Sequence, residues 1–255
     1  MYQIDYNSYR SVKGFNRRVR FLVMHYTAVN FAQSTTLLAG DGGASAHYLV
    51  PDPTEQSYLE AGFKELRLFN LVDENDRAWH AGVSSWDGRT NLNDSSLGIE
   101  IVNLASEDNG VFTFPPYHHE QIAAIKQLAL NIIQRYPDLS PTNVVAHSDI
   151  SPYRKSDPGP AFPWKELYEA GIGAWYDNAT KDKYAEKFLS ALPAKKDIIS
   201  NLQKYGYDVS AATTDTGYKQ LIRAFQLHYR QCDYSGVIDV ETAAILYALV
   251  EKYKS

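Results

Sequence analysis

Two histidines and one aspartate are the residues of this chain whose types and spacing are best suited to chemistry. His25 lies near the end of the apolar run Phe21 to Tyr26, and His147 ends a second short run, Asn143 to His147. Asp157 follows on a loop with proline and glycine. Imidazole nitrogens and carboxylate oxygens are zinc ligands, and three protein ligands leave a fourth position open for water. The trio therefore predicts a catalytic zinc site, and with it a hydrolase.

A single histidine at the end of a strand is most simply explained by a hydrogen bond to the backbone. That interpretation applies equally to His25 and His147 when each is taken alone. Their joint placement at the ends of two predicted strands favours a shared site, because rigid elements hold ligand atoms in fixed positions.

The loop around Asp157 adds a cation to the predicted site. Pro158 disfavours the helical conformation for the residue before it, so Asp157 is expected to be extended. Residues two apart in an extended segment face the same side, which brings Lys155 and Asp157 together. A metal-binding carboxylate beside an ammonium suits a hydrolase that must stabilise an oxyanion. The alternative is a surface Lys–Asp pair of little energetic value, and only the two histidines argue against it.

Glu100 alternates with apolar residues in the predicted strand Leu97 to Asn103. One interpretation puts its carboxylate on a solvated face of the sheet. The other turns it into a cleft, where burial raises the pKa of the carboxyl and suits it to move protons. The pattern alone leaves both interpretations open.

The elements that must position these residues alternate in type up to about residue 175. This alternation predicts a mixed α/β sheet with helices on its faces. The predicted strands cover residues 21–26, 44–50, 66–72, 97–103 and 143–147. The predicted helices cover residues 31–39, 122–133 and 164–170.

The character of the chain changes after Trp175. Residues 179–194 are polar and are expected to form a linker or wrapping segment. Asp239 is a natural N-cap for the last of three helical patterns that follow. These patterns are Ile198 to Tyr205, Tyr218 to Tyr229 and Thr242 to Tyr253. We therefore expect a catalytic domain over residues 1–178 and a small three-helix domain over residues 195–255.

Composition narrows the class of protein further. The 255 residues are 44% hydrophobic and 22% charged, which is typical of a globular protein, and no segment reaches the length of a membrane span. A net charge of -5 gives no basic surface for nucleic acid. The single cysteine, Cys232, excludes an intrachain disulfide and a cysteine-ligated zinc, and it is expected to be buried or half-buried.

Six short segments, in order, resemble the zinc-dependent N-acetylmuramoyl-L-alanine amidases of the AmpD/AmiD type. This is the amidase-2 group, which is related to peptidoglycan recognition proteins. The segments are Val23 to Thr27, Ser45 to Val50, Ala78 to Gly82, Asn93 to Glu100, Val144 to Asp149 and Lys155 to Gly159. They cover roughly residues 15–176. The C-terminal part resembles the three-helix peptidoglycan-binding domain of AmiD-like enzymes through Ala224 to Gln226 and Gly236 to Thr242.

The resemblance implies one zinc ion held by His25, His147 and Asp157. It implies Glu100 as the acid/base and Lys155 as the donor to the oxyanion. The reaction it implies is hydrolysis of the amide between the lactyl group of N-acetylmuramic acid, 1,6-anhydro forms included, and L-alanine of the stem peptide. The fold it implies is a mixed β-sheet flanked by helices.

The remaining candidates concern substrate binding. Trp79 and His80 are expected in the cleft, where an aromatic face can stack on sugar or peptide, although a packed loop is the alternative for His80. His47 fits a substrate or metal-supporting residue as well as a buried, hydrogen-bonded one. Asn93 is a further candidate for binding muropeptide. His118 and His119 precede a helix as a solvated segment, and His228 lies in the C-terminal module away from the predicted chemistry; these three complete the histidines.

Two other classes of function compete with an amidase. A non-catalytic peptidoglycan recognition protein shares the fold but loses zinc ligands, whereas this chain keeps both histidines, the aspartate, the glutamate and the lysine. A zinc peptidase acting within the stem is disfavoured because no His-Glu-x-x-His helix occurs. A wall-binding module favours the periplasm or cell envelope. The polar residues 1–20, with no apolar leader region, leave the cytoplasm as the alternative.

Overall fold

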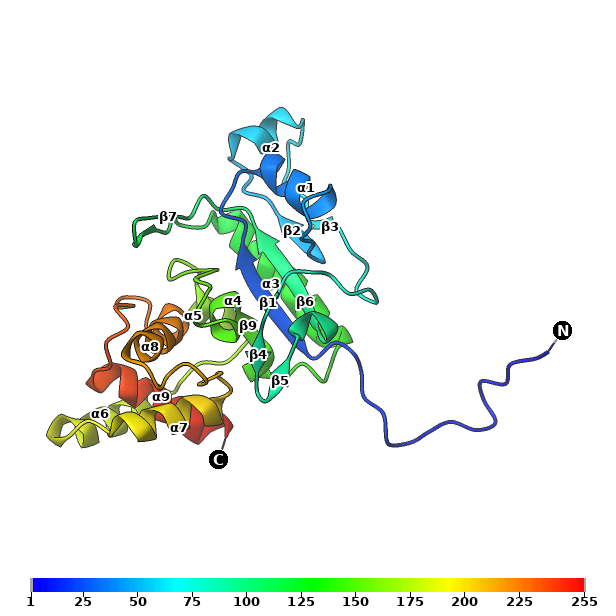
Figure 1. Cartoon of the computed structure of the whole chain (residues 1–255). Helices are drawn as coiled ribbons and strands as arrows, with labels where there is room; N and C mark the ends of the chain where they lie inside the picture. Colours follow the sequence, from blue (N-terminus) through cyan, green and yellow to red (C-terminus); the bar gives the residue numbers. More distant parts are fainter. Residues whose placement is uncertain (1, 255) are drawn as a thin grey trace.

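The computed structural model of the protein describes residues 2–254, so Met1 and Ser255, the outer limits of the predicted domains, lie outside the described residues. A five-stranded sheet forms its centre. The sheet strands are Phe21–Tyr26 (β1), Tyr48–Val50 (β2), Phe69–Asn70 (β3), Ser96–Ile101 (β6) and Val144–Ala146 (β9). Their order is β3-β2-β6-β1-β9, with β3 antiparallel to β2 and the other pairs parallel (Figure 1). The predicted mixed sheet is confirmed.

The sequences of the central strands are continuously apolar because both faces of the sheet are covered. Phe21 to Met24 of β1 and Leu97 and Ile99 of β6 are buried, as expected for parallel strands between layers of helices. The outer strands are shorter than predicted. In the segment 44–50 only the last three residues join the sheet, since the N–H of Ser45 donates to the carbonyl of Trp79 at 3.2 Å. The chain reaches β6 at His47, whose N–H donates to the carbonyl of Gly98 at 3.1 Å.

The helices cover the sheet and continue beyond it. They are Phe31–Ala39 (α1), Gln56–Glu60 (α2), His119–Arg135 (α3), His147–Ile150 (α4), Trp164–Glu169 (α5), Asn178–Ser190 (α6), Lys195–Tyr205 (α7), Asp215–Tyr229 (α8) and Val240–Tyr253 (α9). Short 3-10 turns are Leu92–Asp94 (η1) and Pro141–Asn143 (η2). Two small hairpins pair Ser85–Trp86 (β4) with Arg89–Thr90 (β5), and Ser106–Asp108 (β7) with Val111–Thr113 (β8).

The predicted helices form where their caps and periodicity place them. Asn30 caps α1, where its side chain accepts from the N–H of Gln33 at 2.9 Å. The carboxylate of Asp239 accepts from the N–H of Thr242 at 2.8 Å and begins α9 as predicted. The apolar stripe of α3 is buried, and it consists of Ile122, Ile125, Ala129 and Ile132.

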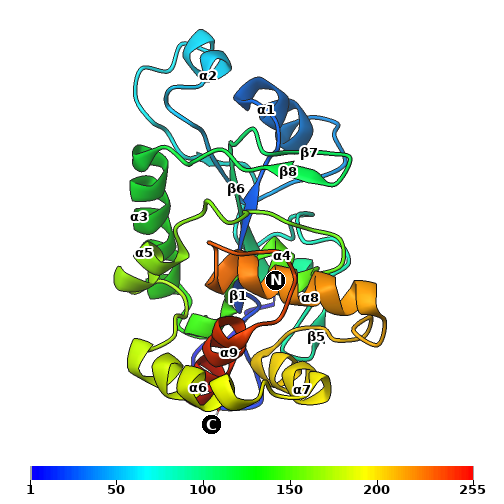
Figure 2. The same ribbon diagram turned by 90° about the vertical axis from the view of Figure 1, so that its left-hand side faces the viewer.

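The segment 179–194, expected to be a linker, is mostly helical, and that part of the prediction is wrong. It contains most of α6, whose Tyr184 and Phe188 pack on Tyr247 of α9 with ring centroids 5.4 and 4.9 Å apart. Only Phe188 of α6 is buried, which is why its sequence resembles a polar connector. Figure 2 shows α6, α7 and α9 together at one end of the molecule, with α8 between them and α4.

The C-terminal helices share a continuous hydrophobic core with the sheet domain. Trp86 of β4 is fully buried between Tyr205 and Tyr207, at centroid distances of 6.0 and 4.8 Å. Cys232 is exposed in the turn after α8, not buried as expected, because the chain leaves the core where that helix ends. Within residues 2–254, none of the helices is long and apolar enough to cross a membrane.

Candidate active site

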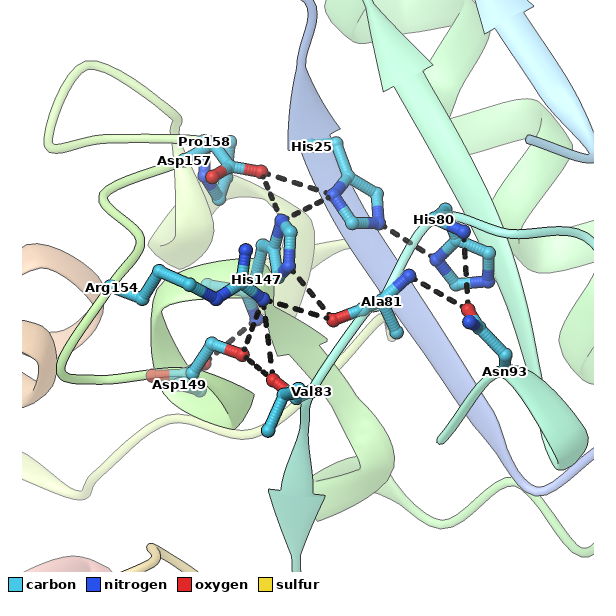
Figure 3. A network of polar contacts seen from close by, with 12 residues as sticks. His25, His80, Ala81, Val83, Asn93, His147, Asp149, Arg154, Asp157 and Pro158 are labelled. Carbon is cyan, nitrogen blue, oxygen red and sulfur yellow. Dashed lines mark hydrogen bonds and ion pairs between the residues drawn. The ribbon is translucent and has the colours of Figure 1, made fainter. Parts of the chain in front are cut away.

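Three side chains from separate elements converge at one end of the central sheet (Figure 3). His25 comes from β1, and Asp157 from the loop after α4. His147 is the first residue of α4, immediately after β9, and not the last residue of a strand as predicted. Parallel pairing of β1 with β9, in which Met24 faces Ala146, brings the two histidines side by side. Nδ1 of His25, Nδ1 of His147 and Oδ2 of Asp157 lie 2.9 to 3.0 Å from one another.

A chain of hydrogen bonds fixes the tautomer of His25. The hydroxyl of Ser96 donates its one proton to the carbonyl of Leu92 at 2.6 Å, so its oxygen accepts from Nε2 of His80 at 3.1 Å. Burial lowers the pKa of His80 well below its ordinary value, which keeps that ring neutral. Nδ1 of His80 therefore accepts, and Nε2–H of His25 donates to it at 2.9 Å. The lone pair on Nδ1 of His25 faces the site.

His147 is oriented in the same way by a different partner. Its Nε2 lies 3.1 Å from the carbonyl oxygen of Ala81, which can only accept, so Nε2 carries the proton. Its Nδ1 then remains the nitrogen that can take a metal, and it lies 2.9 Å from Oδ2 of Asp157. A second ring nitrogen that donates to a neighbour is the usual arrangement for a metal-binding histidine.

The converging atoms have the donor chemistry of a metal centre. Burial, and then the nearby His147, lower the pKa of His25 to about 4, so its imidazole is neutral at pH 7. Burial alone would raise the pKa of Asp157, but the adjacent His147 and His25 hold it well below its ordinary value. Atoms that all carry lone pairs and face one another at 2.9 to 3.0 Å require a proton or a metal cation between them. Tetrahedral zinc at ~2.0–2.1 Å from each ligand separates ligand atoms by roughly 3.3 Å, so the site needs only a small expansion to hold it.

Glu100 lies beside this trio on the neighbouring strand β6. It pairs with His25 in the register of β6 with β1, so both side chains lie on the same face. Its Oε2 is buried, and no hydrogen-bond donor reaches it among the described residues. Burial raises the pKa of Glu100 well above its ordinary value, the Asp157 charge adds to the rise, and Lys155 opposes it. Of the two interpretations of Glu100, the structure favours the cleft.

Four of the predicted catalytic and metal-binding residues line one cavity of about 270 Å³. Lys155 and Asp157 both line it, together with Glu100 and His147, so the predicted same-side placement of the lysine and aspartate is observed. The cavity thus brings together two members of the candidate metal site, a buried carboxyl and a lysine side chain. The sequence did not indicate the rest of the lining, which includes Tyr26 to Val29, Ser34, Leu37 and Leu38.

Trp79 and His80 lie at this cavity, but in different ways. Trp79 is 61% exposed at the rim, with the Arg77 guanidinium 5.0 Å from its ring centroid. His80 is buried, lines the inner wall and binds His25, so it supports a ligand besides facing the cavity.

His47 and Asn93 do not reach the cavity, and the structure does not support direct substrate contact by either residue. His47 is fully buried: its Nδ1 accepts from the N–H of Gly98 at 3.0 Å and its Nε2 faces the carbonyl of Asp76 at 3.3 Å. The side-chain oxygen of Asn93 accepts from the N–H groups of His80 and Ala81, at 3.1 and 2.8 Å. The side chains of both residues form hydrogen bonds with backbone groups and so hold the segment that carries His80 in place.

A second cluster of possible ligands lies far along the chain, at the start of α3. His118, His119 and Glu120 are half-buried or exposed. Nδ1 of His118 accepts from the N–H of Glu120 at 3.3 Å and caps the helix, as the expected helix-start segment implies. Helix capping by His118 explains why a histidine stands here without a metal. The convergence of His25, His147 and Asp157 caps no helix.

Comparison with known proteins agrees with this geometry. Residues 15–160 match the Amidase_2 family, described as N-acetylmuramoyl-L-alanine amidase. The chain belongs to the N-acetylmuramoyl-L-alanine amidase family. The amidase is 42% identical to N-acetylmuramoyl-L-alanine amidase AmiD of Escherichia coli, over 99% of this chain and 89% of AmiD.

Solved structures extend the similarity to the whole fold. The amidase superposes on AmpDh3 from Pseudomonas aeruginosa in complex with anhydromuramic pentapeptide with a TM-score of 0.97, at 61% identity and with 100% of both chains covered. It also resembles AmiD of Escherichia coli in complex with anhydro-N-acetylmuramic acid-L-Ala-D-gamma-Glu-L-Lys, with a TM-score of 0.86 and 41% identity. That match covers 99% of this chain and 96% of AmiD. The predicted family and fold class are confirmed.

Proposed function

We propose that this amidase is a zinc hydrolase that cleaves the amide between the lactyl group of N-acetylmuramic acid, in mature or 1,6-anhydro form, and L-alanine of the stem peptide. The observation that carries the proposal is the placement of Glu100. No donor among residues 2–254 reaches its buried Oε2. Glu100 shares one cavity with His147 and Asp157, and it is the register partner of His25 on the adjacent strand. The anhydromuramyl peptides bound to AmpDh3 and AmiD support the substrate class.

His25, His147 and Asp157 are the residues that would hold one zinc ion. When bound, zinc polarises the scissile carbonyl and lowers the pKa of the attacking water. The protein keeps the ligand lone pairs free for it. Nδ1 of His80 accepts a hydrogen bond from Nε2–H of His25, and the carbonyl of Ala81 accepts one from Nε2–H of His147. Neither ring can therefore turn its protonated nitrogen into the site without losing a hydrogen bond.

Glu100 moves the protons in this scheme. It takes one proton from water as the water oxygen bonds to the lactyl carbonyl carbon. It returns that proton to the nitrogen of L-alanine as the carbon–nitrogen bond breaks. A raised pKa brings the carboxyl closer to the working pH, where it can both accept and donate. The ammonium of Lys155, on the same cavity wall, stabilises negative charge on the carbonyl oxygen.

Trp79 provides the sugar or peptide surface at the cavity rim. One large exposed indole beside a catalytic cavity offers an apolar face to a ligand, and the adjacent guanidinium of Arg77 orients the ring. Glu100 and Lys155 lie further in, so a substrate stacked on Trp79 can extend its scissile amide toward them.

The test is a digest of soluble anhydro-muropeptide and of isolated sacculi, with products identified by mass. We expect release of the intact stem peptide with a free L-alanine amine, abolished by chelator and restored by zinc. Cleavage within the stem would identify a peptidase instead. Binding of both substrates without any release would identify a recognition protein, and either result would overturn the proposal.

We further propose that the amidase meets the wall polymer in the periplasm or cell envelope. The support is a substrate that is part of the wall and a C-terminal module resembling a peptidoglycan-binding domain. Fractionation of cells, with marker enzymes for each compartment, tests this location. Recovery of the amidase solely with cytoplasmic markers would refute it and point to turnover of imported muropeptides.

A further inference from the structure

The C-terminal module reaches the turn that carries His147. Asp149 is the third residue of α4, and its Oδ2 accepts from the N–H of Ala146 at 2.7 Å, which closes the first turn of that helix. The remaining partners of this carboxylate come from the C-terminal module. The hydroxyl of Tyr207 donates to Oδ1 at 2.5 Å, and Nδ1 of His228 lies 2.6 Å from Oδ2.

This cluster is sealed from solvent. Asp149 is fully buried, and Tyr207 and His228 are 2% and 1% exposed. The ring of His228 stacks between Trp164 and Tyr229, with centroids 3.8 and 3.9 Å away. A buried carboxylate depends on its donors because no water replaces a lost one. The module therefore fixes the orientation of the carboxylate that closes the His147 turn.

The same turn is tied to the loop that carries Asp157. The N–H of Ser148 donates to the carbonyl of Asp157 at 3.0 Å, so a shift of α4 moves two ligand segments together. The module also touches this loop directly. Arg223 of α8 donates from Nη1 to the hydroxyl of Ser156 at 2.9 Å, and its guanidinium lies 4.2 Å from the ring of Phe112.

We propose that Tyr207 and His228, on the C-terminal module, are positioning residues for the metal centre, acting through Asp149 on His147 and Asp157. The C-terminal module then supports the active site, in addition to any role in binding peptidoglycan. This inference rests on the proposed function, since it assumes that His147 and Asp157 bind zinc. Neither Tyr207 nor His228 contacts the cavity, so each acts through another residue.

Tyr205 offers a matched control for Tyr207. It lies two residues away, is also fully buried and also uses its hydroxyl, which lies 2.8 Å from that of Tyr229. Its hydrogen bond stays within the C-terminal module. Tyr207→Phe and Tyr205→Phe therefore each remove one buried hydroxyl, but only Tyr207→Phe loosens Asp149. His228→Phe keeps a stacked ring without the donor and tests the same carboxylate independently.

The experiment uses the full chain and measures zinc affinity by competition with a chromogenic chelator, together with the visible spectrum of the cobalt form. We expect Tyr207→Phe and His228→Phe to bind zinc about 10-fold more weakly than wild type, with an altered cobalt spectrum, because residues supporting metal ligands typically change affinity by about 10–100-fold. Tyr205→Phe should stay within about 2-fold of wild type. The kcat on soluble anhydro-muropeptide should fall in the first two variants, although no wall polymer is present.

Outcomes separate this inference from the proposed function. If wild type binds zinc and releases stem peptide while both variants bind zinc as wild type does, positioning is refuted and the amidase mechanism stands. Equal weakening in Tyr205→Phe would also refute it, since general destabilisation would explain the loss. If wild type itself neither binds zinc nor releases stem peptide, the proposed function fails first. Should Tyr207→Phe not fold, His228→Phe decides alone.

Discussion

Nε2 of His25 lies 2.9 Å from Nδ1 of His80, and the two rings meet edge to face at a centroid distance of 5.0 Å. His80 is in turn held by Ser96 on one side and, through its backbone, by Asn93 on the other. The tautomer of His25 is therefore set by His80 and Ser96, and Asn93 holds the backbone of His80 in place. This relationship makes the metal centre sensitive to changes that touch no ligand.

Replacement of His80 by alanine should weaken zinc binding by about 10–100-fold, because Nε2 of His25 loses its acceptor and the ring can rotate. Metal affinity by chelator competition measures the effect. His119→Ala, on the exposed start of α3, is the control and should leave affinity unchanged. Unaltered zinc affinity in His80→Ala would show that the sheet alone fixes His25.

The sequence predicted the residues that converge at the site better than it predicted the residues that hold them. His25 and Glu100 lie on strands that continuous apolar runs predict. Parallel pairing of these strands then places the two residues side by side. The sequence predicts His147 at the end of a strand, but it is the first residue of α4, because the apolar run continues into that helix. The predicted strand 44–50 is longer than β2, since the sequence does not show where the hydrogen-bonded pairing of strands begins.

The supports were missed because their partners are distant or irregular. His80 belongs to a loop with no period, and nothing in that loop indicates that its ring would face His25 instead of substrate alone. Asp149 and His228 are 79 residues apart, and a buried Asp–His contact across two predicted domains has no local signal. The helix α6 was missed because a two-residue apolar contact is too weak a pattern.

Glu100→Gln should lower kcat by about 10²–10⁴-fold, since an amide of the same shape cannot carry a proton between water and the leaving amine. Zinc content should be unchanged, because Glu100 is not among the converging ligand atoms. Single-turnover assays with soluble muropeptide, alongside metal analysis, provide the measurement. Activity within a few-fold of wild type would remove Glu100 from the chemistry.

Lys155→Met keeps the length of the side chain but removes the ammonium from the cavity wall. We expect kcat to fall by about 10²–10³-fold with a small change in KM, as for loss of one oxyanion donor. Lys165→Met, on the exposed side of α5, is the matched control and should be neutral. A change confined to KM would instead assign Lys155 to ground-state binding of the substrate.

Glu74 predicts how stability depends on pH. Its carboxylate accepts from Arg135 and from the hydroxyls of Tyr48 and Tyr136 at 2.7 and 2.8 Å. Burial opposes ionisation, but these hydrogen bonds outweigh it and lower the pKa of Glu74 from 4.5 to about 2. A lowered folded-state pKa stabilises the fold above about pH 4.5 and loses that contribution as the pH falls toward about 2.

Glu74→Gln should therefore reduce the free energy of unfolding by about 1–3 kcal/mol at neutral pH, and by progressively less below about pH 4.5. Urea unfolding at several pH values measures the difference from wild type. Glu186→Gln, exposed on α6, should show no such trend. A Glu74→Gln deficit that stays constant between about pH 6 and about pH 3 would contradict the assignment.

Gly98 tests whether His80 has room to move. An added Cβ would lie 2.5 Å from Cγ and 2.6 Å from Nδ1 of His80, too close for any real contact. The backbone of Gly98 cannot yield easily, because its N–H and carbonyl are both bound to His47 at 3.0 and 3.1 Å. Gly98→Ala should therefore displace the His80 ring, weaken zinc binding by at least about 10-fold and reduce stability by about 1–3 kcal/mol.

The clash predicts a specific coupling between the two positions. Removing the ring in His80→Ala leaves space for the new methyl group, so Gly98→Ala should cost much less stability in that background than in wild type. A double-mutant cycle, read by thermal unfolding and by zinc affinity, gives the coupling energy. If Gly98→Ala lowers stability and zinc affinity equally with and without the His80 ring, the methyl group disturbs β6 itself. In that case the absence of a side chain at position 98 is not explained by the His80 ring.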